Sequence, residues 1–177
     1  MEESPMELLD IMLHRRSVRK YTAEPIPEEK LEKILQAGLL APTSKNRKPC
    51  EFYVVRDKAV LKQLSEAKKL GAGMLSECDA AIAVFADSKK ADTWIEDCSI
   101  AMSFMHLMAA EQGVGSCWVQ IHLRSKNGKD SEEIVRDILK IDDHYRVVGI
   151  MALGHSDDIP PAHEPADVDK NKVHFMV

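Results

Sequence analysis

Residues 92–112 read DTWIEDCSIAMSFMHLMAAEQ and predict one long helix with almost no polar face. A helix of this kind has to be covered on nearly all sides. In a chain of 177 residues, we expect it to be the central helix of the domain, with part of its surface covered by a second subunit. Its methionines are expected to be core residues rather than parts of a ligand site.

The composition indicates a globular protein with one core. A chain of 177 residues that is 45% hydrophobic is too short for two independent domains, so we expect a single domain over residues 1–177 with a tail at 155–177. The net charge of −5 argues against nucleic-acid binding. Residues 1–5 lack the features of a secretory signal, and no apolar run approaches the ~20 residues that span a bilayer, so we expect a cytoplasmic protein without membrane contact.

The cysteines do not form a metal-binding or disulfide pattern. No Cys-x-x-Cys pair or accompanying histidine spacing is present, so no metal site is predicted. Two of the cysteines lie in apolar surroundings and are expected to be core residues. The four cysteines are Cys50, Cys78, Cys98 and Cys117, of which Cys98 and Cys117 are the expected core pair.

Apolar periodicity and helix-end signals predict further helices and strands, which alternate along the chain as in a layered protein of α and β elements. The strand order is not readable from the sequence. Asp57 is predicted to cap one helix, and Asp130 and Glu133 have the spacing of a capping box. The predicted helices are 6–14, 27–39, a helix after Asp57 and 130–139; the strands are 51–56, 80–86 (buried on both faces), 116–121 and 145–153.

A basic segment, HRRSVRK at residues 14–20, is the first candidate for a binding site. It places four cations and one hydroxyl directly after a short helix in an acidic protein. Guanidinium groups match phosphate oxygens in bidentate fashion, and a serine adds a neutral donor. By itself such a segment is more often a solvated basic turn, because charge clusters usually lie on the surface without a specific ligand.

Two more segments carry weaker signals. Residues 41–49 read APTSKNRKP, a loop with hydroxyl, amide and cationic groups between a helix and a strand. Residues 113–118 read GVGSCW, where small residues allow the backbone to approach a flat ligand closely. Residues 71–73, Gly-Ala-Gly, lack the third glycine and the preceding strand of a dinucleotide-binding fingerprint and are expected to form a loop.

In their order, the three segments resemble the FMN-dependent nitroreductase family. Residues 15–19 match its R-R-S-x-R opening, residues 41–52 its A-P-S-x-x-N-x-Q-P-W-x-F loop, and residues 113–118 its G-x-G-T-x-W segment. The resemblance runs from about Leu9 to Gly154. It implies a three-layer α/β/α fold of the α+β class with a central, mostly antiparallel sheet. It also implies a domain-swapped homodimer that holds FMN at the subunit interface. Residues 155–177 would then form a tail that docks on the partner subunit.

The resemblance also assigns site residues. The opening segment would hold the FMN phosphate, with its last arginine near the pyrimidine edge of the ring. The loop would come from the partner subunit, and the third segment would line the ring and offer a backbone N–H near flavin N5. The implied cofactor-binding residues are Arg15, Arg16, Ser17, Arg19, Ser44, Asn46, Lys48, Ser116, Cys117, Trp118 and Lys172.

This chain departs from the family pattern in three places. Lys48 replaces the usual Gln, and a lysine near the ring would favour the reduced, anionic flavin unless its head reaches solvent. Cys50 replaces the usual Trp. The tail beyond Gly154 contains no arginine, so Lys170 or Lys172 would replace the arginine that reaches the phosphate in many members, and Lys172 is the better candidate.

The implied function is an oxidoreductase with a ping-pong mechanism. NADH or NADPH would reduce the flavin at N5, and a nitroaromatic, quinone or related small acceptor would reoxidise it. No catalytic acid or base is required of the protein, and none of its histidines is assigned a role. Two alternatives remain at this point: a flavin-binding sensor or carrier without significant turnover, and an anion-binding domain without flavin.

Overall fold

A four-stranded sheet forms the centre of the protein. The computed structural model describes residues 7–176 of the chain. The strands of the sheet are β1 (Cys50–Val55), β2 (Ala80–Asp87), β3 (Gly115–Gln120) and β6 (Tyr145–Gly154). They lie in the order β1-β2-β6-β3, each antiparallel to its neighbours. A separate hairpin pairs β4 (Ser125–Lys126) with β5 (Lys129–Asp130).

The two middle strands of the sheet, β2 and β6, are the most deeply buried. Residues 80–86 of β2 are all buried, as predicted from their continuous apolar run. They pair with β6 in a register that sets Ile82 opposite Met151. Both faces of these strands therefore have to be covered by helices.

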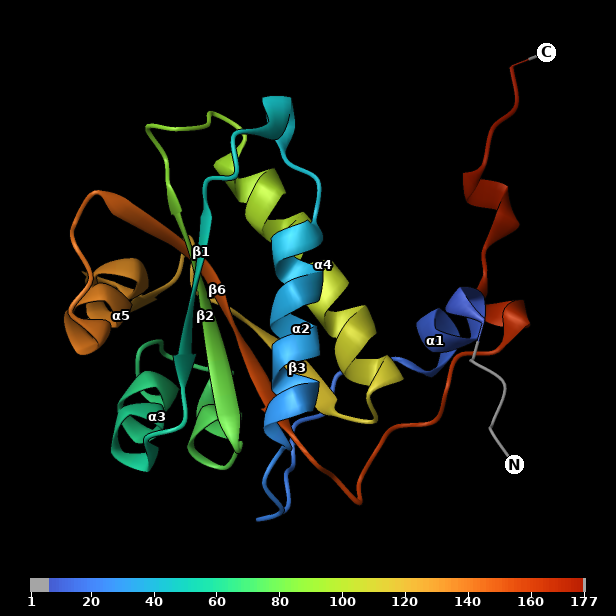
Figure 1. Cartoon of the computed structure of the whole chain (residues 1–177), viewed down its shortest axis with the longest axis horizontal. Helices are drawn as coiled ribbons and strands as arrows, with labels where there is room; N and C mark the ends of the chain where they lie inside the picture. The colour runs from blue at the N-terminus through green and yellow to red at the C-terminus, as the bar shows by residue number, and fades with distance from the viewer. Residues whose placement is uncertain (1–6, 177) are drawn as a thin grey trace.

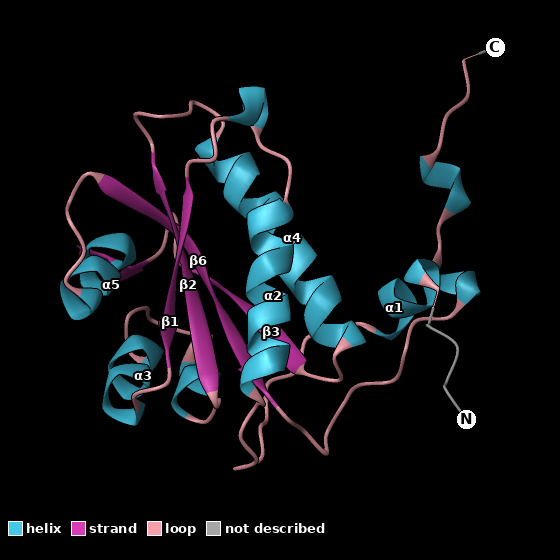
Figure 2. Cartoon of the chain, viewed as in Figure 1, coloured by secondary structure: helices cyan, strands magenta, loops and turns pink. Residues whose placement is uncertain are grey.

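Helices cover the two faces and make three layers (Figures 1 and 2). One face carries α2 (Glu28–Leu40) and α4 (Trp94–Glu111), and the other carries α3 (Lys58–Ser65) and α5 (Ser131–Leu139). Each side has its own apolar core. The predicted α+β class with a three-layer α/β/α arrangement around an antiparallel sheet is confirmed.

Local sequence signals explain where the helices begin. The Asp57 carboxylate accepts hydrogen bonds from the backbone N–H groups of Ala59 and Val60 at 2.9 and 3.0 Å, as a helix cap should. The predicted capping box of α5 is wrong: Asp130 accepts from the N–H of Glu132, two residues on, whereas Glu133 pairs with Lys129 at 3.4 Å.

The helix predicted from residue 6 is α1 (Leu8–His14); Met6 lies outside the described residues, as does the acidic N-terminus at 1–5. α1 lies to one side of the layers, next to the C-terminal end of α4 (Figure 1). Within residues 7–176, no helix is both long enough and apolar enough to cross a membrane.

The long apolar helix predicted at 92–112 is α4, which contacts every strand of the main sheet. The side chains of Cys98, Met102 and Met105 are fully buried, so the predicted core role of Cys98 is confirmed. The opposite side of the helix is only partly covered by residues 7–176, since Ile100 and Phe104 are 37% and 40% exposed. A cavity of about 320 Å³ with an almost entirely apolar lining lies between α1, α2 and α4.

The tail, residues 155–176, leaves the sheet and runs past α1 (Figure 1). It contains two short 3₁₀ turns, η3 (Pro165–Asp167) and η4 (Lys170–Lys172). The N–H of His163 donates to the carbonyl of Leu13 at 2.8 Å and joins the tail to α1. Among the described residues nothing buries its apolar end, since Phe175 is 82% exposed.

Candidate functional site

The first and third segments predicted for binding meet in the structure. Ser17 forms a parallel β-bridge with Ser116, and the N–H of Val18 donates to the carbonyl of Ser116 at 2.9 Å. A glycine is required next to this contact, because a Cβ on Gly115 would lie 2.9 Å from a Val18 methyl and 3.0 Å from the carbonyl oxygen of Gly154. The basic turn therefore lies directly against the edge strand β3.

Two adjoining cavities open at this junction, and Arg15 lines both of them. The larger one has a volume of about 360 Å³ and is lined by Arg15, Ser17, Ser103, His106, Leu107 and Trp118. The smaller one, of about 220 Å³, lies between the basic turn, the end of α4 and β3, and includes Arg16, Ser116 and Ile159 among its lining residues. A guanidinium group thus lies between two spaces that a ligand could occupy.

His106, which the sequence did not single out, forms one wall of the larger cavity. Its Nδ1 lies 2.7 Å from the hydroxyl oxygen of Ser116, and its ring is nearly parallel to that of Trp118, with 6.4 Å between the centroids. Burial, helped by the nearby charge of Arg15, lowers the pKa of His106 to about 4. The imidazole is therefore neutral at pH 7 and contributes hydrogen bonding and shape rather than charge.

Further cations surround the middle of β3. The ammonium group of Lys68 donates to the carbonyl of Gln120 at 3.1 Å, and its pKa is lowered by burial and by the neighbouring charge of Arg124. Burial raises the pKa of the Cys117 thiol, although the charges of Arg19 and Lys68 act in the opposite direction. The predicted core role of Cys117 is confirmed, since it is 2% exposed. Lys68 lies in a loop that carries no motif, so no sequence signal pointed to it.

Not all cations of the basic turn are equally free to bind a ligand. The guanidinium of Arg16 donates to the carbonyl of Pro161 and so holds the tail. Arg19 donates to the carbonyl of Ser17 at 3.3 Å within the turn. Lys20 pairs with Asp158 at 2.7 Å and is 77% exposed. Arg15 is the member of this group that lines both cavities.

The second segment lies at the opposite end of α4. The N–H of Ser44 donates to the carboxylate of Asp97, in the first turns of α4, at 2.9 Å. Asn46 and Lys48 have positive φ angles of 54° and 47°, so the loop is tightly turned. Within one chain, the structure therefore does not bring Ser44, Asn46 and Lys48 to the basic turn.

Lys172 also lies apart from the two cavities. Its side chain is 82% exposed in η4, and its ammonium lies 3.9 Å from the carboxylate of Asp169. The lining residues of both cavities come from other parts of the chain. The suggested replacement of a tail arginine by Lys172 has no support within one protomer.

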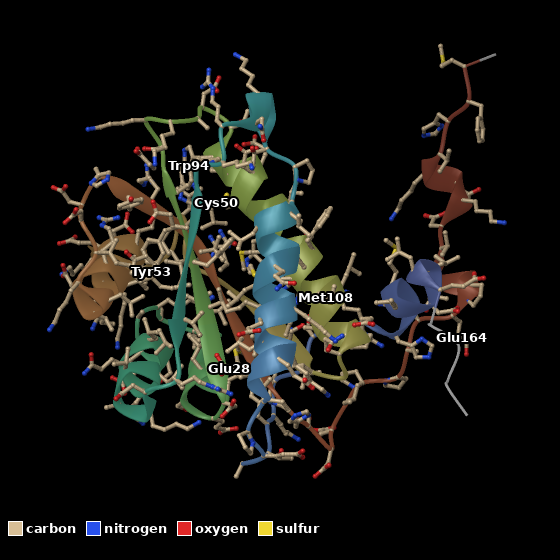
Figure 3. The ribbon with its side chains drawn as sticks, viewed as in Figure 1. Glu28, Cys50, Tyr53, Trp94, Met108 and Glu164 are labelled. Atoms are coloured by element: carbon tan, nitrogen blue, oxygen red, sulfur yellow. The ribbon has the colours of Figure 1, made fainter. Side chains whose placement is uncertain are left out.

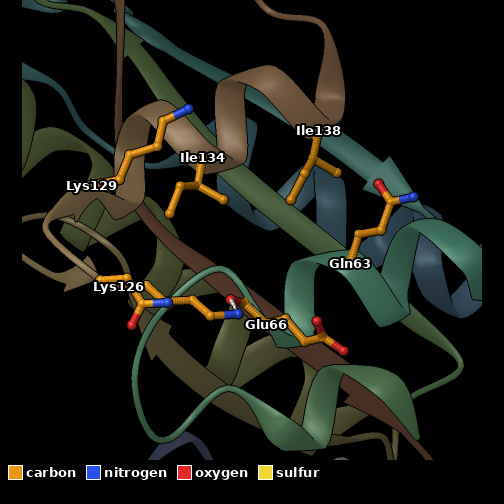
Figure 4. Close-up of a pocket in the computed structure, with 7 residues that line it drawn as sticks. Gln63, Glu66, Lys126, Lys129, Ile134 and Ile138 are labelled. Carbon is orange, nitrogen blue, oxygen red and sulfur yellow. Dashed lines mark hydrogen bonds between the residues drawn. The ribbon is translucent and has the colours of Figure 1, made fainter.

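Another cavity, of about 450 Å³, lies elsewhere, between α3, α5 and the β4–β5 hairpin (Figure 4). It is lined by the side chains of Gln63, Glu66, Ile134 and Ile138, together with lysines of the hairpin. The Lys126 ammonium donates to the carbonyl of Glu66 at 2.6 Å across it. None of the predicted site residues lines this cavity, so the junction at Arg15 and β3 is the better candidate site.

Fold and site together define a three-layer α+β protein with a cation-lined ligand site between a basic turn and an edge strand. A family model for the nitroreductase family matches residues 12–73 and 62–155. The chain therefore belongs to the nitroreductase family, as its three segments predicted.

Individual relatives agree with this assignment. A protein of Archaeoglobus fulgidus named as an NADH dehydrogenase/NAD(P)H nitroreductase is 38% identical over 165 residues, which cover 91% of this chain and 92% of the relative. The solved structure of an FMN-dependent nitroreductase from Clostridium difficile R20291 is 42% identical, covers 94% of this chain and 98% of its own, and has a TM-score of 0.92. A Parabacteroides distasonis structure, also named as an NADH dehydrogenase/NAD(P)H nitroreductase, is 32% identical over 95% and 96% of the two chains, with a TM-score of 0.85.

Proposed function

We propose that this protein is an FMN-dependent oxidoreductase that transfers electrons from NADH or NADPH to a nitroaromatic, quinone or related small acceptor by a ping-pong mechanism. The observation that carries the proposal is the junction of the basic turn with β3. There, Arg15 and Ser17 line a cavity next to the Trp118 ring, and Arg15 also lines the adjoining cavity. This combination offers anion-binding groups and a flat wall within one site.

The residues of the junction fit the two ends of FMN. Arg15 and Ser17 would bind the phosphate, because a guanidinium and a hydroxyl supply several donors to its oxygens. Arg16 contributes less directly, since its guanidinium holds the carbonyl of Pro161. Arg15 would be the principal phosphate ligand, because it is the member of the basic turn that lines both cavities.

The edge strand would line the flavin ring. β3 pairs with β6 on one side, so alternate N–H groups, those of Ser116 and Trp118, face away from β6. Ser116 is already bridged by Ser17, so the N–H of Trp118 would be the one offered to the ring. The charges of Arg19 and Lys68 act on the neighbouring Cys117 thiol, and in this proposal they would stabilise a ring that gains negative charge. When bound, FMN supplies the centre that accepts a hydride and passes electrons on.

A homodimer is part of this proposal. The apolar surface of α1 and α4 supports it, because Leu8 and Leu9 are 60% and 63% exposed beside the partly exposed Phe104. The loop with Ser44, Asn46 and Lys48 lies away from the basic turn of its own chain, so a partner subunit would have to supply it. The tail at 155–177 would dock on that partner, which would bury the apolar end of the tail. Because each subunit would extend its tail onto the other, the dimer would be domain-swapped. A cytoplasmic location and a single domain over 1–177 stay predictions.

Spectroscopy of the purified protein tests the proposal directly. The protein reconstituted with FMN should show a flavin spectrum that NADH or NADPH bleaches under anaerobic conditions. It should then oxidise the nicotinamide continuously when a quinone is added, with a saturable dependence on the quinone. A protein that takes up no FMN would contradict the flavin assignment. One that takes up FMN without turnover would instead be a flavin carrier or sensor.

A further inference from the structure

Two cysteines that are distant in the sequence lie in contact at the end of the molecule away from the basic turn. The sulfur atoms of Cys50 and Cys98 are 3.3 Å apart, although 48 positions separate the residues. Cys50 begins β1, and Cys98 lies in the second turn of α4. Figure 3 shows Cys50 on β1 beside α4. A disulfide bond is about 2.05 Å long, so the sulfurs need to approach by only about a further 1.3 Å.

The two thiols differ in access. Cys98 is fully buried, whereas Cys50 is half-buried and lines a cavity of about 60 Å³ together with Thr43 and Lys48. On this measure roughly 10–15 Å³ is enough to hold one water molecule, so the cavity has room for a peroxide molecule. The hydrogen bond with Cys50 and burial raise the pKa of the Cys98 thiol, so Cys98 stays protonated in the resting protein. Cys50 is therefore the sulfur that a small oxidant reaches first.

We propose that Cys50 and Cys98 form a redox-sensitive pair that closes to an intramolecular disulfide when hydrogen peroxide is the oxidant. In the first step, the Cys50 sulfur forms a bond to one peroxide oxygen as the O–O bond breaks, which leaves a sulfenic acid and one water. The Cys98 sulfur then attacks the Cys50 sulfur, the S–O bond breaks, and a second water leaves with the thiol proton of Cys98. The two thiols lose two electrons in total, and the peroxide gains them.

Closure of the pair would bind the loop at residues 43–49 more firmly to α4. One end of this loop is already held by the hydrogen bond from the Ser44 N–H to Asp97, the residue before Cys98. The other end leads directly into Cys50. A disulfide would replace the contact between the Cys50 and Cys98 sulfur atoms by a covalent bond. Oxidation would therefore fix the position of Lys48 and its neighbours. Disulfide formation itself does not depend on the flavin role proposed above.

The other two cysteines provide internal controls. The Cys78 thiol donates to the carbonyl of Leu75 at 3.3 Å, and the Cys117 sulfur lies 3.8 Å from the carbonyl oxygen of Trp118. Both are buried, and neither has a sulfur contact among the hydrogen bonds of residues 7–176. Peroxide at low excess should therefore leave these two thiols unchanged.

Mass spectrometry of the full-length protein tests the proposal. After peroxide treatment, we expect an intact mass lower by two hydrogen atoms and a fall in titratable thiols from four to two in denaturant, both reversed by dithiothreitol. Trypsin would leave Cys98 and Cys117 on one peptide, because no Lys or Arg lies between them. Digestion should therefore use a protease that cuts after glutamate, since a cut at Glu111 separates the two cysteines. The linked peptides should join Cys50 to Cys98.

Variants and a stability measurement sharpen the test. Cys50→Ser and Cys98→Ala should abolish the linked peptide, and Cys98→Ala should leave a sulfenic acid on Cys50 that dimedone traps. Cys78→Ala should form the link as the wild type does. The oxidised wild type should melt about 5–10 °C higher, and trypsin should cut after Lys45 and Arg47 more slowly.

Absence of a linked Cys50–Cys98 peptide from folded, peroxide-treated wild type would overturn the proposal, even where a variant fails to fold. A link that involves Cys78 or Cys117 to the same extent would also overturn it. None of these measurements requires bound FMN, so their outcome is distinct from that of the flavin assignment.

Discussion

The Nδ1 atom of His106 and the hydroxyl oxygen of Ser116 lie 2.7 Å apart and join the central helix to the edge strand at the candidate site. Both side chains are buried, at 8% and 2% exposure. The contact lies next to the bridge between Ser116 and Ser17. Helix, strand and basic turn are therefore held together at one point, and the protonation state of one histidine affects all three.

His106 should make the protein less stable in mild acid. Because its pKa is lowered from 6.5 to about 4, the unfolded state binds more protons than the folded state between these values. The free energy of unfolding then falls as the pH falls through this range, and this histidine contributes about 2 kcal/mol of the loss between pH 7 and pH 5. In urea denaturation, His106→Gln should lose this part of the pH dependence, whereas His174→Gln, in the exposed tail, should keep it. An unchanged pH dependence in His106→Gln would contradict the neutral role.

Arg15→Ala should weaken FMN binding by roughly 10- to 100-fold, as expected for the loss of a charge-assisted hydrogen bond to phosphate. The free energy of unfolding without FMN should change by no more than about 0.5 kcal/mol. Fluorescence titration of FMN measures the first quantity, and urea denaturation the second. Lys20→Ala is the matched control in the same turn, because Lys20 is 77% exposed and pairs with Asp158. Equal FMN affinities for the two variants would argue against Arg15 as the phosphate ligand.

Gly115→Ala should push the basic turn away from β3. The new methyl group would lie 3.0 Å from the carbonyl oxygen of Gly154 and 2.9 Å from Val18, and backbone cannot move as easily as a side chain. We expect a loss of about 1–3 kcal/mol in the free energy of unfolding and weaker FMN binding. Gly73→Ala is the control, since nothing lies within 4 Å of a Cβ there. If both variants unfold at the same urea concentration, the close approach at Gly115 is not required.

Glu132→Ala should be among the most destabilising single changes in the protein. The carboxylate is 2% exposed and accepts hydrogen bonds from Arg146 at 2.8 and 2.9 Å and from the N–H of Val147 at 2.9 Å, with His122 at 2.7 Å. Although burial alone would raise the pKa of Glu132, the Arg146 guanidinium and the Val147 N–H lower it. Removal of the carboxylate leaves these donors unpaired and should cost about 3–5 kcal/mol, measured by urea denaturation. Glu133→Ala, on the exposed side of the same helix, should cost less than about 1 kcal/mol.

Local patterns in the sequence predicted the elements well, because burial follows directly from residue type. The apolar run at 80–86 gave a strand buried on both faces, and the Asp57 cap formed as predicted. At Asp130 only the cap formed and not the box, since Glu133 lies by Lys129 instead, and such a contact is not visible from spacing alone. The pairing of β6 with both β2 and β3 depends on contacts between distant segments, which the sequence does not encode locally.

The candidate site was predicted only where it coincides with a motif. Resemblance to the family assigned Arg15 and Ser17, which line the site. His106 and Lys68 carry no local signal, because one lies in an otherwise apolar helix and the other in a plain loop. Each acquires a role only when β3 folds next to it. In the same way, the contact between Cys50 and Cys98 arises from packing across 48 positions.

The position of β6 between β2 and β3 governs how the chain can fold. β6 is the last strand in the sequence, yet it supplies the pairing partner of two strands that come earlier. Until residues 145–154 arrive, β3 has no neighbour in the sheet and β2 has one exposed edge. Contacts between residues so far apart in the sequence are slow to form, so folding should require nearly the whole chain and proceed without a stable N-terminal intermediate. During synthesis, the nascent chain would expose the apolar edge of β2 until β6 has been made.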